Sequence, residues 1–332
     1  MADFTPPTTP VSSEAAAAPA GPSNLRLRII YGLIGAAMLL SCVWFSPWTF
    51  GLFFAGVQAV MLREFYRMMR AGGYAPAAWI GIGANFLFLP IVYFALATSS
   101  LTISNSKISP ELFQTNADGK GVLIQKMAES QLATDFFTLK LLLLILLLLP
   151  IVLIVREIIV WPKYKQPFSN VGSTLLGLIY VSIPMSLLGF IAVDLKYGVY
   201  DYRRVVALLF LIWASDIGAY IAGKSFGKHK MAPSISPGKT WEGWAGGFLL
   251  TLVIGWAMGY FLPDVPLTHR LVAAGVVAVF APLGDLAESM LKRSVGVKDS
   301  GTFLPGHGGL LDRFDAFLLV LPVLALLQLL AG

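Results

Sequence analysis

Long apolar runs separated by short polar segments are the feature of this sequence that most limits its fold. Of its 332 residues, 57% are hydrophobic and only 13% are charged, about half the charged share of a soluble domain. This composition excludes a disordered chain, a collagen, a coiled coil and an ordinary soluble enzyme. Runs of about 20 apolar residues can cross a bilayer as helices. The sequence therefore predicts an all-α fold, a polytopic integral membrane helical bundle.

We expect about nine transmembrane helices, with ends defined only to within several residues. Their predicted ranges are 27–45, 48–62, 78–98, 138–155, 172–193, 205–223, 244–262, 270–287 and 314–331. The second is short for a span and follows Pro47, so it is either tilted or entered through a tight turn. No fixed-period repeat is present, which excludes a solenoid.

These spans divide the chain into five regions. They are a disordered cytoplasmic tail at 1–24, N-terminal transmembrane helices at 25–98, a solvated extracytoplasmic loop at 99–137, middle transmembrane helices at 138–203 and a C-terminal transmembrane region at 204–332. The first region lacks a basic segment followed by an apolar core, so it does not read as a cleaved signal peptide.

The distribution of Lys and Arg predicts the orientation. Loops on one side of the predicted membrane hold 16 of these residues and loops on the other side hold 8. The richer side should be cytoplasmic, which puts the N-terminus and the polar segments 224–243 and 288–313 inside. The net charge of +6 is then explained by topology and anionic lipid, and no nucleic-acid partner is expected. The single Cys42 excludes an intramolecular disulfide framework and a Cys-rich metal site.

Four aspartates lie near the predicted cytoplasmic ends of apolar spans, where charge needs a reason. They are Asp216, Asp285, Asp312 and Asp315. Any one of them is explained as well by helix capping or by ion pairing at the membrane surface. Four carboxylates converging on one face favour a site for a hard cation such as Mg²⁺.

Two cytoplasmic segments supply positive charge and glycine beside these carboxylates. In 224–243 the basic residues include Lys239, and the alternative reading is a plain lipid-binding loop. In 296–309 five glycines make a permissive loop whose backbone N–H groups could approach phosphate oxygens. Glu288 and Lys292 are spaced to pair on a helix. Together these features suit transfer chemistry on phosphates, in which catalysis is mostly positioning and charge neutralisation.

Three segments carry a resemblance to a known family. They are Ser289 to Asp315 (SMLKR, KDSG, LPGHGG and DRFD), Asp216 to Lys224 (DIGAY with GK) and Ser234 to Gly243 (SISPGKTWEG). They resemble the signature of the phosphatidate cytidylyltransferases, over roughly the C-terminal 40% of the chain. One departure is Ile217, where the family pattern has Thr. The resemblance implies the reaction of CTP with phosphatidate to give CDP-diacylglycerol and diphosphate, in phospholipid biosynthesis.

The resemblance also implies residue roles, cofactors and partners. The implied catalytic residues are Asp285, Asp312, Lys292, Arg293 and Lys239. The implied substrate-binding residues are Ser236, Thr240, Lys298, Asp299, His307, Gly308, Gly309 and Arg313. The implied metal ligands are Asp285 and Asp312 first, then Asp216, Glu288 and Asp315. It further implies Mg²⁺, a second cation such as K⁺, a homodimer and a catalytic site at the cytoplasmic ends of the helices in 204–332. The sequence has no cysteine pair, no N-glycan sequon and no transit-like N-terminus, which favours a bacterial cytoplasmic (inner) membrane over an organelle.

Three other classes of protein share some of these features. A secondary transporter predicts polar groups at the bilayer midplane in two related halves, whereas the polar residues here gather at one face. Another membrane transferase acting on lipid phosphates is the nearer alternative. A CDP-alcohol phosphotransferase would need a D-x₂-D-G-x₂-A-R run, which is absent from this sequence. A structural membrane protein would not need the concentration of carboxylates and basic residues.

Overall fold

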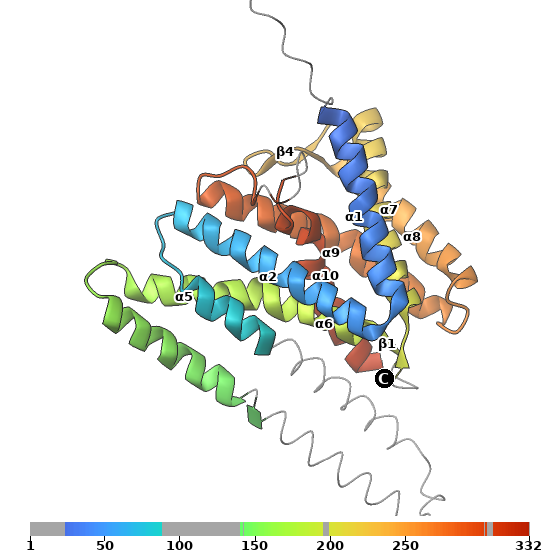
Figure 1. Ribbon diagram of the computed structural model, residues 1–332. Coiled ribbons are helices and arrows are strands. Elements are labelled where there is room, and N and C mark those ends of the chain that lie inside the picture. The colour runs from blue at the N-terminus through green and yellow to red at the C-terminus, as the bar shows by residue number, and fades with distance from the viewer. Residues whose placement is uncertain are drawn as a thin grey trace, which may run out of the picture.

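The chain is described by a computed structural model over residues 24–87, 140–141, 143–194, 199–301, 303 and 308–331, and these residues form a helical bundle (Figure 1). Within this part of the chain, six helical stretches are long and apolar enough to cross a membrane. They are Leu143–Val160, Pro167–Ile191, Tyr202–Phe226, Trp241–Tyr260, Leu267–Ser294 and Leu311–Leu330. The predicted class, an α-helical integral membrane protein, is confirmed.

The predicted count of nine spans stays a prediction. Shorter apolar helices occupy Ile30–Phe45 and Ala78–Leu87, and the rest of the predicted span 78–98 lies outside the described residues. The predicted tail (apart from Asn24) and the predicted loop 99–137 also lie outside them.

Helices α1 (Asn24–Phe45) and α2 (Pro47–Ala71) meet at a tight turn that a capping box holds. Ser46 Oγ accepts the N–H of Thr49 at 3.1 Å, and Thr49 Oγ1 accepts the N–H of Ser46 at 3.1 Å. Pro47 suits the first helical position because its missing N–H would have no helical partner there. Helix α2 runs nine residues beyond the predicted end at residue 62, and its buried face includes Phe65 and Tyr66.

The middle of the chain packs on α2 through Tyr66. The run Pro167–Ile191 consists of α5 (Pro167–Gly177), the π-helix η2 (Leu178–Ser182) and α6 (Ile183–Ile191). The Tyr66 hydroxyl donates to the Thr174 carbonyl of α5 at 2.9 Å. A Cβ on Gly177 would lie 2.5 Å from the Tyr66 ring, so this close contact of α2 with α5 requires glycine.

A two-residue antiparallel ribbon, β1 (Val193–Asp194) with β2 (Val199–Tyr200), leads into α7 (Tyr202–Phe226). Asp201 is the N-cap of α7, and its carboxylate accepts from the backbone N–H and the guanidinium of Arg203. Burial would raise the pKa of Asp201, but the hydrogen bonds and charges of its arginine neighbours outweigh it and lower that pKa.

Helices α7 and α8 (Trp241–Ala257) cross along a seam of small residues. A Cβ on Gly218 would lie 2.8 Å from the Gly246 carbonyl, and one on Gly247 would lie 2.6 Å from the Ser215 carbonyl. Small residues let helix backbones approach closely where lipid offers no hydrophobic drive. The connection between them is a β-hairpin, β3 (Lys230–Ala232) with β4 (Ser236–Thr240), where the sequence predicts a loop.

The last two helices, α9 (Leu267–Ser294) and α10 (Leu311–Ala331), complete the bundle. A short 3-10 turn, η3 (Met258–Tyr260), precedes α9. Helix α9 continues seven residues beyond its predicted end, so Glu288, Lys292 and Arg293 belong to its last turns. A Cβ on Gly284 would lie 2.6 Å from the Asp315 carbonyl, so glycine permits the close crossing of α9 and α10.

Candidate active site

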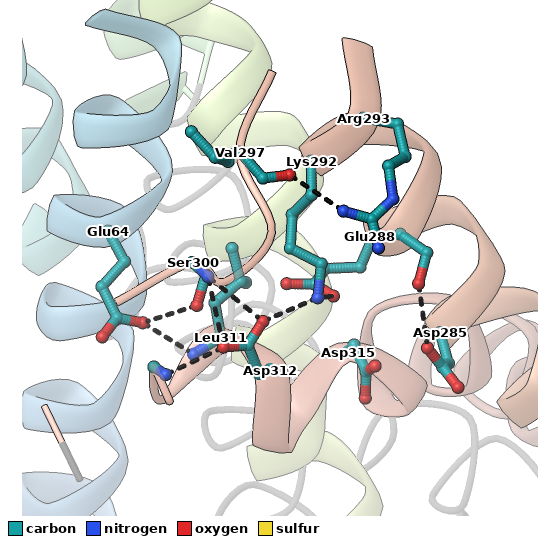
Figure 2. Close-up of polar contacts among 12 residues, drawn as sticks. Glu64, Asp285, Glu288, Lys292, Arg293, Val297, Ser300, Leu311, Asp312 and Asp315 are labelled. Atoms are coloured by element: carbon teal, nitrogen blue, oxygen red, sulfur yellow. Dashed lines mark hydrogen bonds and ion pairs between the residues drawn. The ribbon is translucent and has the colours of Figure 1, made fainter. Parts of the chain in front are cut away.

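Three carboxylates gather where α9 crosses α10. Asp285 and Glu288, three residues apart on α9, lie on one helical face, and Asp315 comes from the first turns of α10. One oxygen from each carboxylate lies within 4.8 Å of the others. Figure 2 shows all three at this crossing. We call Asp285, Glu288 and Asp315 the acidic cluster.

The chemistry of the acidic cluster fits a hard divalent cation. All of its donors are carboxylate oxygens, which Mg²⁺ and Ca²⁺ prefer. The Glu288 side chain is fully buried, and its Oε1 atom has no hydrogen-bond partner among the described residues. A buried carboxylate oxygen without a partner is costly unless a ligand satisfies it. The donor set therefore fits a cation, although nothing in it selects one divalent ion over another.

Lys292 joins the acidic cluster to Asp312. Its Nζ atom lies 2.5 Å from Glu288 Oε2 and 2.8 Å from Asp312 Oδ1 (Figure 2). The predicted pairing of Glu288 with Lys292 along the helix is therefore confirmed. The one ammonium thus forms an ion pair with each of two nearly buried carboxylates, which offsets part of the cost of burying their charges.

Asp312 also organises the glycine-rich segment. It accepts the backbone N–H of Gly309 at 2.8 Å and that of Ser300 at 3.2 Å. Gly308 has a φ of +84°, and a Cβ there would lie 2.8 Å from Asp312 Oδ2. Asp312 is thus bound to Lys292 and two backbone amides and lies outside the acidic cluster, so its predicted role as a metal ligand stays a prediction.

The β3–β4 hairpin delivers Lys239 to the same place. Its Nζ atom lies 2.6 Å from Asp285 Oδ2 and donates to the Pro282 carbonyl at 2.9 Å. Asp216, exposed on α7, interacts electrostatically with Asp285 and Lys239. The structure therefore brings residues from the three resembling segments together where α7, the β3–β4 hairpin, α9 and α10 meet.

The other predicted site residues have varied surroundings. Thr240 is buried as the N-cap of α8, and its hydroxyl accepts the Gly243 N–H at 3.1 Å. The Arg293 guanidinium donates to the Val297 carbonyl at 3.2 Å. His307 lies outside the described residues. The remaining ones, each exposed or partly exposed, are Ser236, Lys298, Asp299 and Arg313.

Two residues of the site are not among the sequence predictions. Glu64, buried on α2, accepts the N–H of Leu311 at 2.8 Å. Tyr180 lies in η2, and its buried hydroxyl has no hydrogen-bond partner within the described part of the chain. Tyr180 interacts electrostatically with all three members of the acidic cluster. A signal existed for Glu64, a lone acid in the arginine-rich run REFYRMMR, whereas Tyr180 carries none.

The cytidylyltransferase family model matches residues 26–330 of this chain. The chain belongs to the cytidylyltransferase family. Three curated relatives support this membership, each called phosphatidate cytidylyltransferase. The Bacillus subtilis protein is 43% identical over 175 residues, which is 52% of this chain and 64% of the relative. The Staphylococcus saprophyticus protein is 39% identical over 171 residues, 50% of this chain and 62% of the relative.

The third relative matches this chain over a similar length and at a similar identity. The Staphylococcus aureus protein is 40% identical over 181 residues, 52% of this chain and 65% of the relative. This chain thus spans less than two thirds of the length of each of these relatives. The family resemblance predicted from the sequence motifs is confirmed.

Proposed function

We propose that this chain is a phosphatidate cytidylyltransferase. It would join CTP to phosphatidate and release diphosphate, making CDP-diacylglycerol for phospholipid synthesis. The observation that carries the proposal is the acidic cluster of Asp285, Glu288 and Asp315, flanked by Lys239 and Lys292 in a membrane protein of the cytidylyltransferase family. In this reaction a phosphatidate oxygen forms a bond to the α-phosphorus of CTP. The bond from that phosphorus to the bridging oxygen breaks, and the electron pair leaves with diphosphate.

The residues of the site would act by charge and position. The phosphate of phosphatidate is an anion at neutral pH, so it needs no strong base to activate it. The main barrier is repulsion between two anionic substrates, which lysines at the reacting phosphates would reduce. Lys239 and Lys292 are held by carboxylates at 2.6 and 2.5 Å, and such contacts fix where their ammonium groups lie. Arg293, Lys298 and Arg313 supply further positive charge at the exposed edge.

The acidic cluster would hold the divalent cation, which we propose to be Mg²⁺. When bound, such an ion neutralises charge on phosphate oxygens and helps the diphosphate depart. Asp216 and Asp312, the other predicted ligands, would add negative charge near the cation or orient the residues beside it. K⁺ as a second cation and a homodimeric state are further parts of this proposal, and they rest on the family resemblance.

We propose that the site faces the cytoplasm in a bacterial inner membrane. The count of basic residues per loop supports this orientation. Phosphatidate would enter sideways from the bilayer while CTP arrives from the cytosol, since both must meet at the ends of the helices that carry the site.

The experiment that tests the proposal is an assay of product identity on the purified protein in detergent. CTP labelled in the base is supplied with phosphatidate and Mg²⁺, and both lipid-soluble cytidine and diphosphate are measured. We expect the two products in equal amounts. Diacylglycerol in place of phosphatidate, and ATP in place of CTP, are the controls and should give little product. Phosphorylation of a lipid alcohol without diphosphate release would overturn the proposal in favour of a lipid kinase.

A further inference from the structure

Glu64 is a buried acid far in sequence from the other site residues. It lies in the second half of α2 with a relative exposure of only 6%, next to the fully buried Phe65. Placing a carboxylate in such surroundings is unfavourable unless hydrogen bonds compensate it. Its partners therefore indicate what it does in the fold.

Its two partners are Ser300, in the segment before α10, and Leu311, at the start of α10. Glu64 Oε2 accepts the Leu311 N–H at 2.8 Å and lies 3.4 Å from the Ser300 hydroxyl (Figure 2). Leu311 is the first residue of α10, so its N–H has no partner within the helix. A carboxylate at a helix N-terminus is also favoured by the helix dipole. One turn along α2, Arg67 donates to the Ser300 carbonyl at 3.3 Å.

The carboxylate also fills the space between two stretches of backbone. A Cβ on Gly301 would lie 2.1 Å from Glu64 Oε1. A Cβ on Gly309 would lie 2.0 Å from Ser300 Oγ and 2.7 Å from Glu64 Oε2. A larger residue at either position would therefore displace the Glu64 carboxylate or the Ser300 hydroxyl.

Glu64 and Asp312 hold the same residue from two sides. Glu64 accepts a hydrogen bond from the Ser300 hydroxyl, and Asp312 accepts one from the Ser300 backbone N–H at 3.2 Å. Glu64 also holds the residue just before Asp312 in the chain. Any shift of the Glu64 carboxylate would thus move Asp312, and with it the Lys292 ammonium that Asp312 contacts at 2.8 Å.

We propose that Glu64 is a positioning residue for the site. From α2 it fixes Ser300 and the start of α10, so that Asp312 stays against Lys292 beside the acidic cluster. This inference rests on the proposed function for its catalytic consequence, but the clamp itself can be tested without turnover.

The test compares three proteins in detergent: the wild type, Glu64→Gln and Met61→Leu. Gln keeps the size of the side chain and one acceptor oxygen but loses the charge. Met61 is fully buried on α2 three residues earlier, and its change to Leu conserves volume, so it is the matched control for altering this helix. Amide hydrogen exchange of the whole chain and the kinetics of CTP turnover are measured on each.

We expect faster exchange at Ser300, Gly309 and Leu311 in Glu64→Gln and unchanged exchange in the α7–α8 pair. We also expect kcat to fall about tenfold, the factor for losing one charge-assisted hydrogen bond at the site, with KM for phosphatidate unchanged. Met61→Leu should match the wild type in both measurements. A purely structural role would instead lower the yield of folded protein and leave kcat per folded molecule unchanged.

The outcomes separate the two proposals. Unchanged exchange over 300–311 in Glu64→Gln would overturn the clamp, whether or not the protein turns over CTP. Faster exchange with a normal kcat would overturn the positioning role. A wild type that folds and exchanges as expected but makes no CDP-lipid would overturn the proposed function and leave the clamp supported.

Discussion

The indole N–H of Trp244 on α8 donates to the Ala278 carbonyl on α9 at 3.1 Å. Pro282 lies four residues further along α9 and has no N–H to offer that carbonyl. Trp244 therefore satisfies a carbonyl that proline leaves without its helical partner. The carbonyl of Pro282 itself accepts a hydrogen bond from the Lys239 ammonium. One proline thus ties α8 and the β3–β4 hairpin to the turn of α9 just before Asp285.

Trp244→Phe should lower stability by about 1 kcal/mol, because a buried carbonyl loses its donor. The midpoint of thermal unfolding in detergent measures the effect. Trp256→Phe is the matched control on the same helix, since Trp256 is 56% exposed and should shift the midpoint little. Equal shifts in the two variants would contradict the role given to Trp244.

Lys292→Met should destabilise the fold by about 3–5 kcal/mol, because it leaves Glu288 and Asp312 buried without their shared cation. Lys292→Arg keeps the charge and should lose much less stability. Both variants are compared with the wild type by urea unfolding in a mild detergent. A Met variant as stable as the Arg variant would show that the shared ion pair contributes little.

The clamp predicts a coupling between Glu64 and Gly301. Gly301→Ala places a methyl group 2.1 Å from the Glu64 carboxylate and should destabilise by about 1–3 kcal/mol through overpacking. Glu64→Asp shortens the acid and makes room, so the same change should cost less in that background. A double-mutant cycle on unfolding free energies measures the coupling. Strictly additive effects would mean that the two residues do not compete for this space.

Asp201 predicts a pH dependence of stability. Its folded-state pKa is lowered, so its contribution is fully present above the unfolded pKa of about 4 and is lost as pH falls through the folded pKa. Asp201→Ala should therefore lower stability by about 1 kcal/mol at pH 7, with the difference from the wild type shrinking below about pH 4. Asp264→Ala, at the more exposed partner of Arg203, is the control and should have little effect at either pH. A difference in stability between Asp201→Ala and the wild type that stays constant from pH 7 to below pH 4 would contradict the role given to the Asp201 carboxylate.

Most of the fold could be predicted from the sequence because a helix that crosses a bilayer needs a continuous run of about 20 apolar residues. Apolar runs such as 205–223 and 314–331 fall within three residues of the structural spans Tyr202–Phe226 and Leu311–Leu330. Helix α9 extends beyond its predicted range because Glu288, Lys292 and Arg293 are polar yet remain helical, with Glu288 and Lys292 paired one turn apart. The sequence does not predict the β3–β4 hairpin, because its five-residue strand contains proline and glycine, which are depleted in strands.

Some residues of the candidate site could also be predicted from the sequence, whereas others could not. The carboxylates at span ends could be found because charge at membrane depth is rare, and the resemblance named most of their neighbours. Which acids gather depends on tertiary packing: the crossing at Gly284 brings Asp315 to Asp285 and Glu288, and Asp312 binds backbone amides instead. Glu64 and Tyr180 could not be predicted from the resembling segments, because only the fold brings α2 and η2 to them.

The central claim is that the acidic cluster supports metal-dependent transfer from CTP to phosphatidate. The most direct measurement is lipid-soluble cytidine formed by purified wild type and Asp285→Asn, with Mg²⁺ and with EDTA. We predict product only from the wild type with Mg²⁺, and at least a hundredfold less from the folded variant, a loss on the order of that for removing a key charge-stabilising group. Equal turnover in the two proteins, or turnover that survives EDTA, would contradict the claim.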